Sequence, residues 1–496
     1  MEEAAVRDGA PGLKSWREKT EKRIGKDLAE KHPAAEPLLA LIEYRMEDAA
    51  DDFRYGLSRL FLFDTLYGKK KKTRMIAGAL APLLWAGSKI KHRAARKADP
   101  RLVFSNTFLL SARYPAAREA IDRETGCTVI LAFSDLLKME GTERRMNLKA
   151  SLKLQEWSRR PVFLRGSSVC GSALEKAVIR YSSLAYDPAV PAAEKTKEKM
   201  EQALQALEKA YLKRTDRIAA CLRKEDCAVY LTVNQYNLRD LLIIHACKNL
   251  GIRTLQQEHH ASQFNRQQYD EHHPMPRLSF AGEYGFWNRT EQLFHEKVYR
   301  YESPLYRPEE IRFRVTGNPE ISREEALRLQ QQYPQERKLT LMLASMQDYE
   351  TRGKRDAYEA WRRSIFRGLR ELAEKQHVTV CIRYTPNRET DLREKEAPVL
   401  QEWGFRISES LPGNLMEDLC TSCAVMSSTS SVLCTARMFG KLTFRVEDWE
   451  IRYVHVDDEV HEVTPAEIPE IVIPEGIENA VPEIGRDAAF SIGKIL

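Results

Sequence analysis

The stretch CAVYLTVNQYNLRDLLIIHACKNLGIRTLQQE, residues 227–258, decides the fold that we expect for this chain. A run of β-branched and apolar residues at 227–233 precedes a helical pattern at 238–250, and a second strand pattern covers 252–258. Gly251 stands directly after the helical pattern, where a left-handed helix end is expected. A strand, a helix and a strand with short connections predict a parallel sheet with a right-handed crossover.

The same alternation of strands and helices extends in both directions from this unit. Before it we predict strands at residues 102–106, 127–133 and 161–166 and helices at 114–124 and 195–224. After a polar, histidine-rich loop we predict strands at 313–316, 339–345, 378–384, 405–410, 423–426 and 442–446 and helices at 357–376, 415–420 and 432–439. The fold class is therefore α/β, with two Rossmann-like, doubly wound domains at residues 99–315 and 316–470 and a tail at 471–496.

The first 98 residues differ in character from these domains. They carry helical apolar spacing, and we expect them to form a separate extension. Ten of the chain's positive charges and no acidic residue lie between Lys69 and Lys97, whereas the whole chain has a net charge of +6. The remainder is therefore net acidic, which argues against a general nucleic-acid-binding surface. The apolar run MIAGALAPLLW, residues 75–85, is too short to span a bilayer; it fits either an anionic membrane interface or a buried helix beside a solvated charge run.

The composition excludes several classes of protein. Hydrophobic residues make up 43% of the 496 residues, which is enough for two or three domain cores and excludes a disordered chain. Nine scattered cysteines favour reduced thiols over a disulfide scaffold. The N-terminus lacks the apolar core of a signal peptide, and no apolar run reaches the roughly 18 residues of a spanning helix. We expect a cytoplasmic protein, with peripheral association at the inner face of the cell membrane as an option.

A run of five hydroxyl residues joins a predicted buried strand to a predicted helix in the C-terminal domain. Ligands of open parallel sheets bind beyond the carboxyl ends of the strands, and hydroxyls next to free helix N–H groups suit a phosphate. The alternative is simple helix capping, for which one hydroxyl is enough. We therefore predict a phosphate site formed by Ser427, Ser428, Thr429, Ser430 and Ser431.

Two further motifs lie where the same ligand would bind. RYTPN ends another predicted strand of this sheet, so Arg383 and Thr385 are candidate donor-binding residues; the alternative is a surface arginine followed by a turn. TGNP lies where the chain crosses between the domains, and Gly317 and Asn318 allow the backbone to approach a ligand closely. A purely structural turn is the equal alternative there.

The candidate catalytic residues follow the last strand of the opening unit. Glu258, His259 and His260 come directly after it and are expected to face the gap between the domains. A histidine can take the proton of an attacking hydroxyl, and a carboxylate beside it can act as the base or orient the ring. His272 and His273 lie farther along, but their spacing from the first pair matches no standard zinc site, and we expect no metal.

These motifs resemble those of bacterial GT-B glycosyltransferases that build surface polysaccharides, which include capsule polymerases, polysialyltransferase-like enzymes and teichoic-acid glycerophosphotransferases. VTGNP is similar to their domain-crossing element, RTLQQEHHA to their Gln-His-Gly element and RYTPN to their Arg-x-His-Pro element. The serine motif matches at Ser430, Ser431, Ala436, Gly440 and Lys441. The sequence departs from the family pattern at Thr385, which replaces histidine, Thr435, which replaces glutamate, and Leu442, which replaces proline.

The resemblance implies transfer of a sugar from a nucleotide-activated donor to a glycan or lipid-linked acceptor. The donor would bind the C-terminal domain, and the N-terminal domain would bind the acceptor, with His259 or Glu258 as the base. No cofactor or metal is implied, and no specific nucleic acid partner is expected; the segment from Lys69 to Lys97 would hold the enzyme at an anionic membrane surface. The alternatives are a phosphotransferase that uses CDP-glycerol or CDP-ribitol, a nucleotide-sugar epimerase, and an inactive GT-B scaffold.

Overall fold

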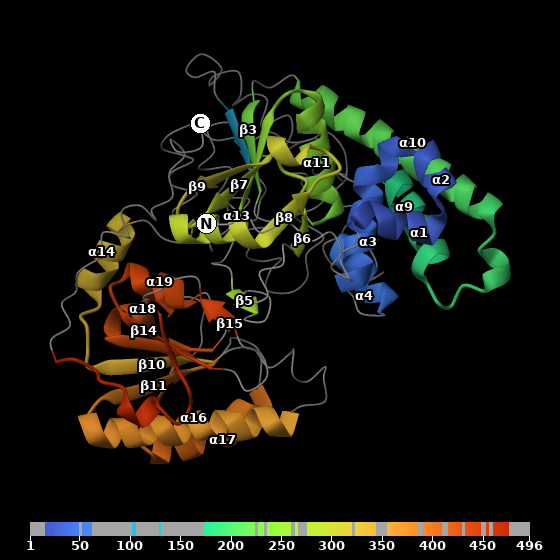
Figure 1. The fold of residues 1–496 in the computed structure, drawn as a ribbon. Coiled ribbons are helices and arrows are strands. Elements are labelled where there is room, and N and C mark those ends of the chain that lie inside the picture. Colours follow the sequence, from blue (N-terminus) through green and yellow to red (C-terminus); the bar gives the residue numbers. More distant parts are fainter. Residues whose placement is uncertain are drawn as a thin grey trace, which may run out of the picture.

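The structure is a computed structural model, and it forms two α/β lobes with a helical layer beside the first (Figure 1). It describes residues 15–48, 52–61, 102–105, 128–129, 172–223, 227–232, 236–258, 263–265, 275–319, 323–343, 355–384, 390–408, 415–428, 432–447, 453–455 and 460–475. The predicted helix at 114–124, the strand at 161–166, the apolar run at 75–85, the basic segment from Lys69 to Lys97 and the tail beyond 475 lie outside these residues.

The first lobe contains a six-stranded parallel sheet, as the opening stretch of sequence predicts. Helix α11 (Leu238–Asn249) connects two adjacent strands of this sheet, and Asn237 caps it by accepting a hydrogen bond from the Asp240 amide. Gly251 has a φ of +68°, which is the predicted left-handed conformation. The strand order is β2-β1-β3-β4-β7-β9, with β1 Leu102–Ser105, β2 Thr128–Val129, β3 Cys227–Thr232, β4 Arg253–Gln257, β7 Glu283–Phe286 and β9 Arg312–Val315.

Part of this lobe was expected to be loop. β7 is a central strand whose four residues are all buried, and it lies within the predicted loop between residue 258 and β9. The same stretch also contains α13 (Arg289–Val298) and a two-stranded parallel sheet of β6 (Met275–Leu278) and β8 (Tyr299–Glu302). β7 escapes prediction because it is short and contains a glutamate and a glycine, which both disfavour strands.

The second lobe has its own six-stranded parallel sheet, in the order β12-β11-β10-β13-β14-β16. The order reverses between β10 and β13, which is the strand order of a dinucleotide-binding α/β fold. The strands are β10 Lys338–Met342, β11 Thr379–Arg383, β12 Arg406–Ser408, β13 Ala424–Ser427, β14 Leu442–Val446 and β16 His461–Val463. One apolar cluster covers the face under α16 (Arg355–Gln376), and another covers the face under α14 (Arg323–Gln332), α18 (Leu415–Thr421) and α19 (Val432–Met438). The predicted fold class, α/β with two doubly wound domains and a helical N-terminal segment, is confirmed.

The N-terminal helices do not form the separate extension that the sequence suggested. Buried side chains of these helices belong to the same apolar cluster as those of the first lobe, and Tyr44 stacks on Tyr236 with ring centroids 4.6 Å apart. Arg45 Nε donates to the Tyr236 carbonyl oxygen at 2.6 Å. The helices are α1 Trp16–Ile24, α2 Lys26–Lys31, α3 Glu36–Asp48 and α4 Phe53–Leu60, and they pack with α9 Ser172–Tyr186, α10 Lys197–Leu222 and α11. They are therefore part of the first lobe's core.

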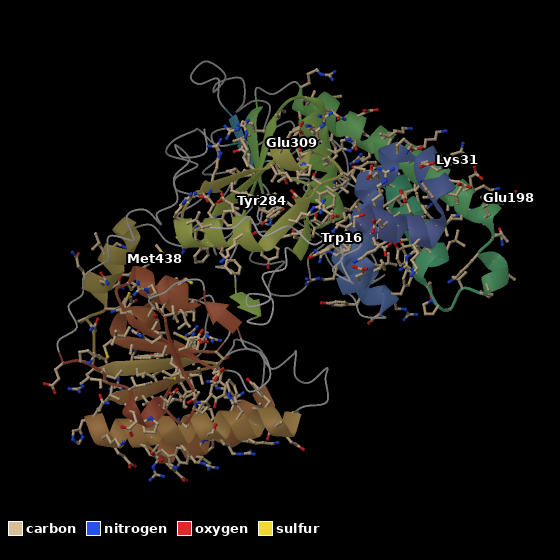
Figure 2. All side chains as sticks on the ribbon, in the orientation of Figure 1. Trp16, Lys31, Glu198, Tyr284, Glu309 and Met438 are labelled. Atoms are coloured by element: carbon tan, nitrogen blue, oxygen red, sulfur yellow. The ribbon has the colours of Figure 1, made fainter. Side chains whose placement is uncertain are left out.

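Contacts between the lobes occur in at least two places among the described residues. β5 (Gln263–Asn265) from the first lobe pairs antiparallel with β15 (Tyr453–His455) from the second. At the chain crossing, Asn318 Nδ2 donates to Met438 Sδ at 3.0 Å; Figure 2 shows Met438 on the side of the second lobe nearest the first. Within the residues that the structure describes, no helix is both long enough and apolar enough to cross a bilayer.

Candidate functional site

The candidate site lies at the carboxyl edge of the second sheet, where the strand order reverses. Met342 ends β10, and its register partners are Arg383 on β11 and Ser427 on β13. The sheet therefore brings together two residues that the sequence places 44 positions apart. A reversal of strand order opens a crevice outside the carboxyl ends of the flanking strands, which is the usual ligand position in this type of sheet.

The hydroxyl run begins inside the sheet. Ser427 is fully buried, and its Oγ donates to the Met342 carbonyl oxygen at 2.7 Å, so this hydroxyl ties β13 to β10. Ser428 follows it and is also buried. Thr429, Ser430 and Ser431 lie outside the described residues, so their place in a phosphate site stays a prediction. The following helix, α19, has seven residues, and a helix of two turns adds little charge to such a site.

Arg383 has an internal partner. Its Nη1 donates to Asp418 Oδ2 at 2.7 Å and to Ser408 Oγ at 3.2 Å, and the Ser408 hydroxyl donates to the same carboxylate at 2.6 Å. The guanidinium thus links β11, β12 and α18, instead of pointing unpaired at a ligand as the sequence suggested. Its contact with a donor phosphate remains a prediction that requires exchange of Asp418, and Thr385 lies outside the described residues.

The crossing between the lobes is tightly packed. Gly317 has a φ of +95°, and its carbonyl oxygen accepts from Gln257 Nε2 at 3.2 Å. Asn318 is fully buried and reaches Met438 on α19. These contacts support the structural turn over direct donor contact, because both residues are enclosed by protein atoms.

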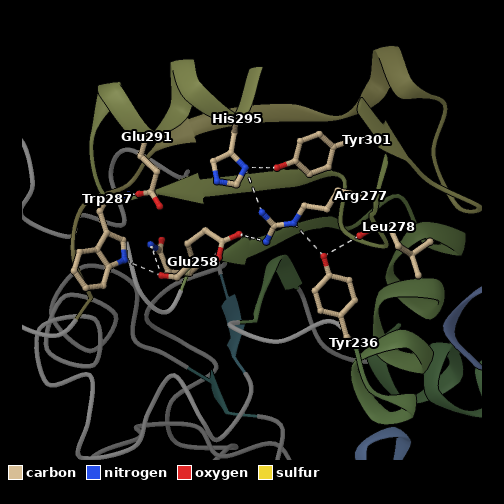
Figure 3. Close-up of polar contacts among 9 residues, drawn as sticks. Tyr236, Glu258, Arg277, Leu278, Trp287, Glu291, His295 and Tyr301 are labelled. Carbon is tan, nitrogen blue, oxygen red and sulfur yellow. Dashed lines mark hydrogen bonds and ion pairs between the residues drawn. The ribbon is translucent and has the colours of Figure 1, made fainter. Parts of the chain in front are cut away.

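A buried polar network surrounds Glu258 at the carboxyl end of β4, and Figure 3 shows its members pointing toward one another. Glu258 Oε1 accepts from Arg277 Nη2 at 2.8 Å, and the Glu258 side chain is only 2% exposed. The backbone is held on both sides, since the Glu258 amide donates to the Gly285 carbonyl and its own carbonyl accepts from Trp287 Nε1, each at 2.9 Å. The network fixes the point at which the chain leaves β4 toward His259.

The prediction that Glu258 serves as the catalytic base is not supported by this geometry. A buried carboxylate bound to a guanidinium does not reach an acceptor hydroxyl, so Glu258 is better described as a positioning residue. His259 and His260 lie outside the described residues and stay the candidate bases. Arg277 was missed, because nothing in the local pattern of MPRL identifies an inward-pointing arginine.

The far side of the network contains a neutral histidine. His295 Nδ1 lies 3.3 Å from Arg277 Nη1 and 2.6 Å from Tyr301 Oη. Arginine can only donate, so Nδ1 is the accepting nitrogen of the ring and the ring proton is on Nε2. Burial, and then the charge of Arg277, hold the pKa of His295 well below its ordinary value.

This histidine should make the fold sensitive to mild acid. Below about pH 6.5 His295 becomes protonated in the unfolded chain but stays neutral in the folded protein. The free energy of unfolding therefore decreases as the pH falls, by up to about 1.4 kcal/mol per pH unit. Urea unfolding at pH 7.5 and pH 5.5 should show a smaller loss for His295→Gln, which keeps an acceptor for Tyr301, than for the wild type. An equal loss in both proteins would contradict this account of His295.

Another arginine that the sequence analysis missed lies beside the hydroxyl run. Arg445 is the register partner of Ser427 on the neighbouring strand β14, and its side chain is fully buried. The sequence LTFRV does contain a sign of it, because a charged residue interrupts an otherwise apolar inner strand. Buried charges of this kind are enriched at binding sites.

The chain is similar to solved structures but to no sequence family. No family model matches it, and no curated protein is similar to it in sequence. Among solved structures, the UDP-GlcNAc 2-epimerase from Methanocaldococcus jannaschii is 10% identical with a TM-score of 0.38, over 78% of this chain and 97% of that one. A glycosyltransferase from Rickettsia africae is 9% identical with a TM-score of 0.38, over 80% and 96%. MurG from Acinetobacter baumannii is 10% identical with a TM-score of 0.34, over 78% and 93%. Similarities at this level support no conclusion about the function of this chain.

Proposed function

We propose that this protein is a glycosyltransferase that moves a sugar from a nucleotide-activated donor to a glycan or lipid-linked acceptor of a surface polysaccharide. The observation that carries the proposal is the position of the hydroxyl run. Its first member, Ser427, ends β13 next to β10, at the point where the strand order of the second sheet reverses. That edge is where a sheet of this type binds a nucleotide.

The chemistry assigns different roles to the two lobes. The acceptor oxygen attacks the anomeric carbon of the donor sugar, the bond from that carbon to the donor phosphate breaks, and the nucleotide leaves with the electron pair. The hydroxyls of residues 427–431 would stabilise the departing phosphate, and His259 would take the acceptor proton. Fixed hydrogen-bond donors aimed at a developing charge supply a large part of the rate in such reactions.

The contacts between the lobes support this division of roles. The Glu258 network holds the backbone at the end of β4, and β5, the next strand that the structure describes, pairs with β15 of the second lobe. This pairing holds the two lobes together, as a reaction between a donor on one and an acceptor on the other requires. The basic segment from Lys69 to Lys97 would bring the enzyme to an anionic membrane that carries the acceptor.

Nucleotide binding tests the proposal. Thermal unfolding with CMP, CDP, UDP and GDP should show stabilisation by at least one of them, about 2.7 kcal/mol at 100 times its Kd. Ser430→Ala and Ser431→Ala should reduce that stabilisation. A matched control is Ser422→Ala, because Ser422 lies at the opposite, amino end of β13, with its hydroxyl 2.5 Å from the Asp418 carbonyl oxygen that it donates to. Failure of all four nucleotides, or equal loss in Ser422→Ala, would refute the assignment.

A further inference from the structure

We propose that Arg445 is the cation of the donor-phosphate site and that Glu462 occupies the position of the phosphate when no donor is bound. This inference rests on the proposed function, because it names the chemistry with which the same edge of the sheet would take a phosphate or diphosphate. It also predicts that substituting the two residues of one ion pair changes anion affinity in opposite directions.

Three neighbouring strands, β13, β14 and β16, hold Ser427, Arg445 and Glu462 side by side in register. Ser427 on β13 is the register partner of Arg445 on β14, and Arg445 is the register partner of Glu462 on β16. Adjacent strands lie about 4.8 Å apart, so the guanidinium group can reach the space in front of either neighbour. The three residues are also near the carboxyl ends of their strands, where the ligand of this sheet is expected.

The side chains of Arg445 and Ser427 lie on the same face of the sheet. Phe444 and Val446 belong to the apolar cluster of the α16 face, so Arg445 between them points to the opposite face. Val425 belongs to the cluster that contains residues of α19, and Ser427, two positions later on the same strand, shares its face. Arg445 thus lies on the side of the sheet where the hydroxyl run leads into α19.

Within the described part of the chain, the guanidinium group of Arg445 has an ion-pair partner but leaves hydrogen-bond donors unused. Its Nε, Nη1 and Nη2 atoms are all buried, and none makes a hydrogen bond of normal geometry with the residues that the structure describes. Nη2 does form an ion pair with Glu462 Oε1 at 2.6 Å. A buried cation with unused donors is costly, and an arginine presents a planar fork that fits the oxygens of a phosphate.

Glu462 is suited to give way to a ligand. Its side chain is 39% exposed, whereas that of Arg445 is fully buried, so the carboxylate is the member of the pair that solvent reaches. An incoming phosphate would displace the carboxylate, which can turn into water at little cost. The phosphate brings more acceptor oxygens than the carboxylate uses, so it can satisfy the donors that are unused in the empty protein.

The competing explanation is a purely structural ion pair, and the two explanations predict different effects of removing Glu462. If the pair is only structural, Arg445→Gln and Glu462→Gln both lower stability and neither changes anion affinity. If Glu462 competes with the ligand, Glu462→Gln releases Arg445 and tightens anion binding. Arg445→Gln weakens it.

Isothermal titration of the full chain with UDP, CDP, GDP and inorganic pyrophosphate tests this directly. Arg445→Gln should weaken binding on the order of 10- to 100-fold, as expected for lost charge-assisted hydrogen bonds, and Arg445→Lys should weaken it less. Glu462→Gln should tighten it several-fold. The matched control is Arg406→Gln, because Arg406 also pairs with a glutamate, Glu336 at 2.6 Å, but both side chains are exposed and lie away from the carboxyl edge of the sheet; its affinity should not change.

The outcomes separate this inference from the proposed function. A wild type that binds a nucleotide, together with an equally tight Arg445→Gln variant, overturns only the role of Arg445. Binding of pyrophosphate without any nucleotide supports the anion site and overturns the proposed function, whereas no binding of any probe overturns both. If Arg445→Gln does not fold, the affinities of Arg445→Lys and Glu462→Gln for the same anions test the inference instead. Weaker anion binding by Glu462→Gln than by the wild type contradicts it.

Discussion

Replacing Arg277 by methionine should lower the free energy of unfolding by about 3–5 kcal/mol, the cost of leaving a buried charge without its partner. Glu258 would lose the guanidinium group that its Oε1 contacts at 2.8 Å, in a position where it is almost completely buried. His295 would also lose a donor to its Nδ1 atom. Equilibrium unfolding in urea at pH 7.5, followed by circular dichroism, measures the change.

The control for this prediction removes both charges. In Glu258→Leu combined with Arg277→Met, no uncompensated charge remains, so the double variant should be clearly more stable than Arg277→Met alone. Costs that simply add in the double variant would show that the two side chains act independently. The ion pair would then not be the reason for the stability of this region.

Gly285→Ala should lower the free energy of unfolding by about 1–3 kcal/mol, the usual cost of overpacking a core. A Cβ at this position of β7 would lie 2.6 Å from Thr316 Oγ1, 2.8 Å from Thr316 Cγ2 and 2.7 Å from Gln257 Oε1. Rotation of the threonine cannot relieve this, because both of its branches are too close. Gln257 is held as well, since its Nε2 donates to the carbonyl oxygens of Glu258 and Gly317 at 3.2 Å each.

A second substitution separates overpacking from a general intolerance of this strand. Thr316→Ala removes both threonine atoms that the new methyl group would meet, so Gly285→Ala should cost less in that background than in the wild type. Gly251→Ala serves as a comparison, because a Cβ there meets nothing within 4 Å and only the positive φ opposes it. An equal cost of Gly285→Ala in both backgrounds would contradict the packing argument.

The sequence predicted those parts of the fold that local patterns determine. The unit at residues 227–258 was predictable because its apolar periods and Gly251 agree with one another. α17 (Thr390–Glu402) was not predicted, because Pro398 lies inside it and proline normally ends a helix. β7 was missed for a tertiary reason: Glu283 at its start is accepted in the sheet because it pairs with Arg253 and Arg314.

The candidate site was predictable in its position but not in its partners. Strand and helix patterns were enough to place Ser427 and Arg383 at one edge of one sheet. The pairs of Glu258 with Arg277, Arg383 with Asp418 and Arg445 with Glu462 depend on elements that meet only in the folded chain. No local spacing encodes these pairs, and they are what changes the roles of Glu258 and Arg383.

The central claim is that the carboxyl edge of the second sheet, around β13 and β14, binds the nucleotide of an activated donor. Hydrogen–deuterium exchange of the full chain, with and without saturating CMP, CDP, UDP or GDP, tests this claim most directly. The account predicts that at least one nucleotide slows exchange in peptides that cover residues 424–446, while peptides from α1 to α4 stay unchanged. Protection confined to the first lobe, or no protection by any of the four nucleotides, would contradict it.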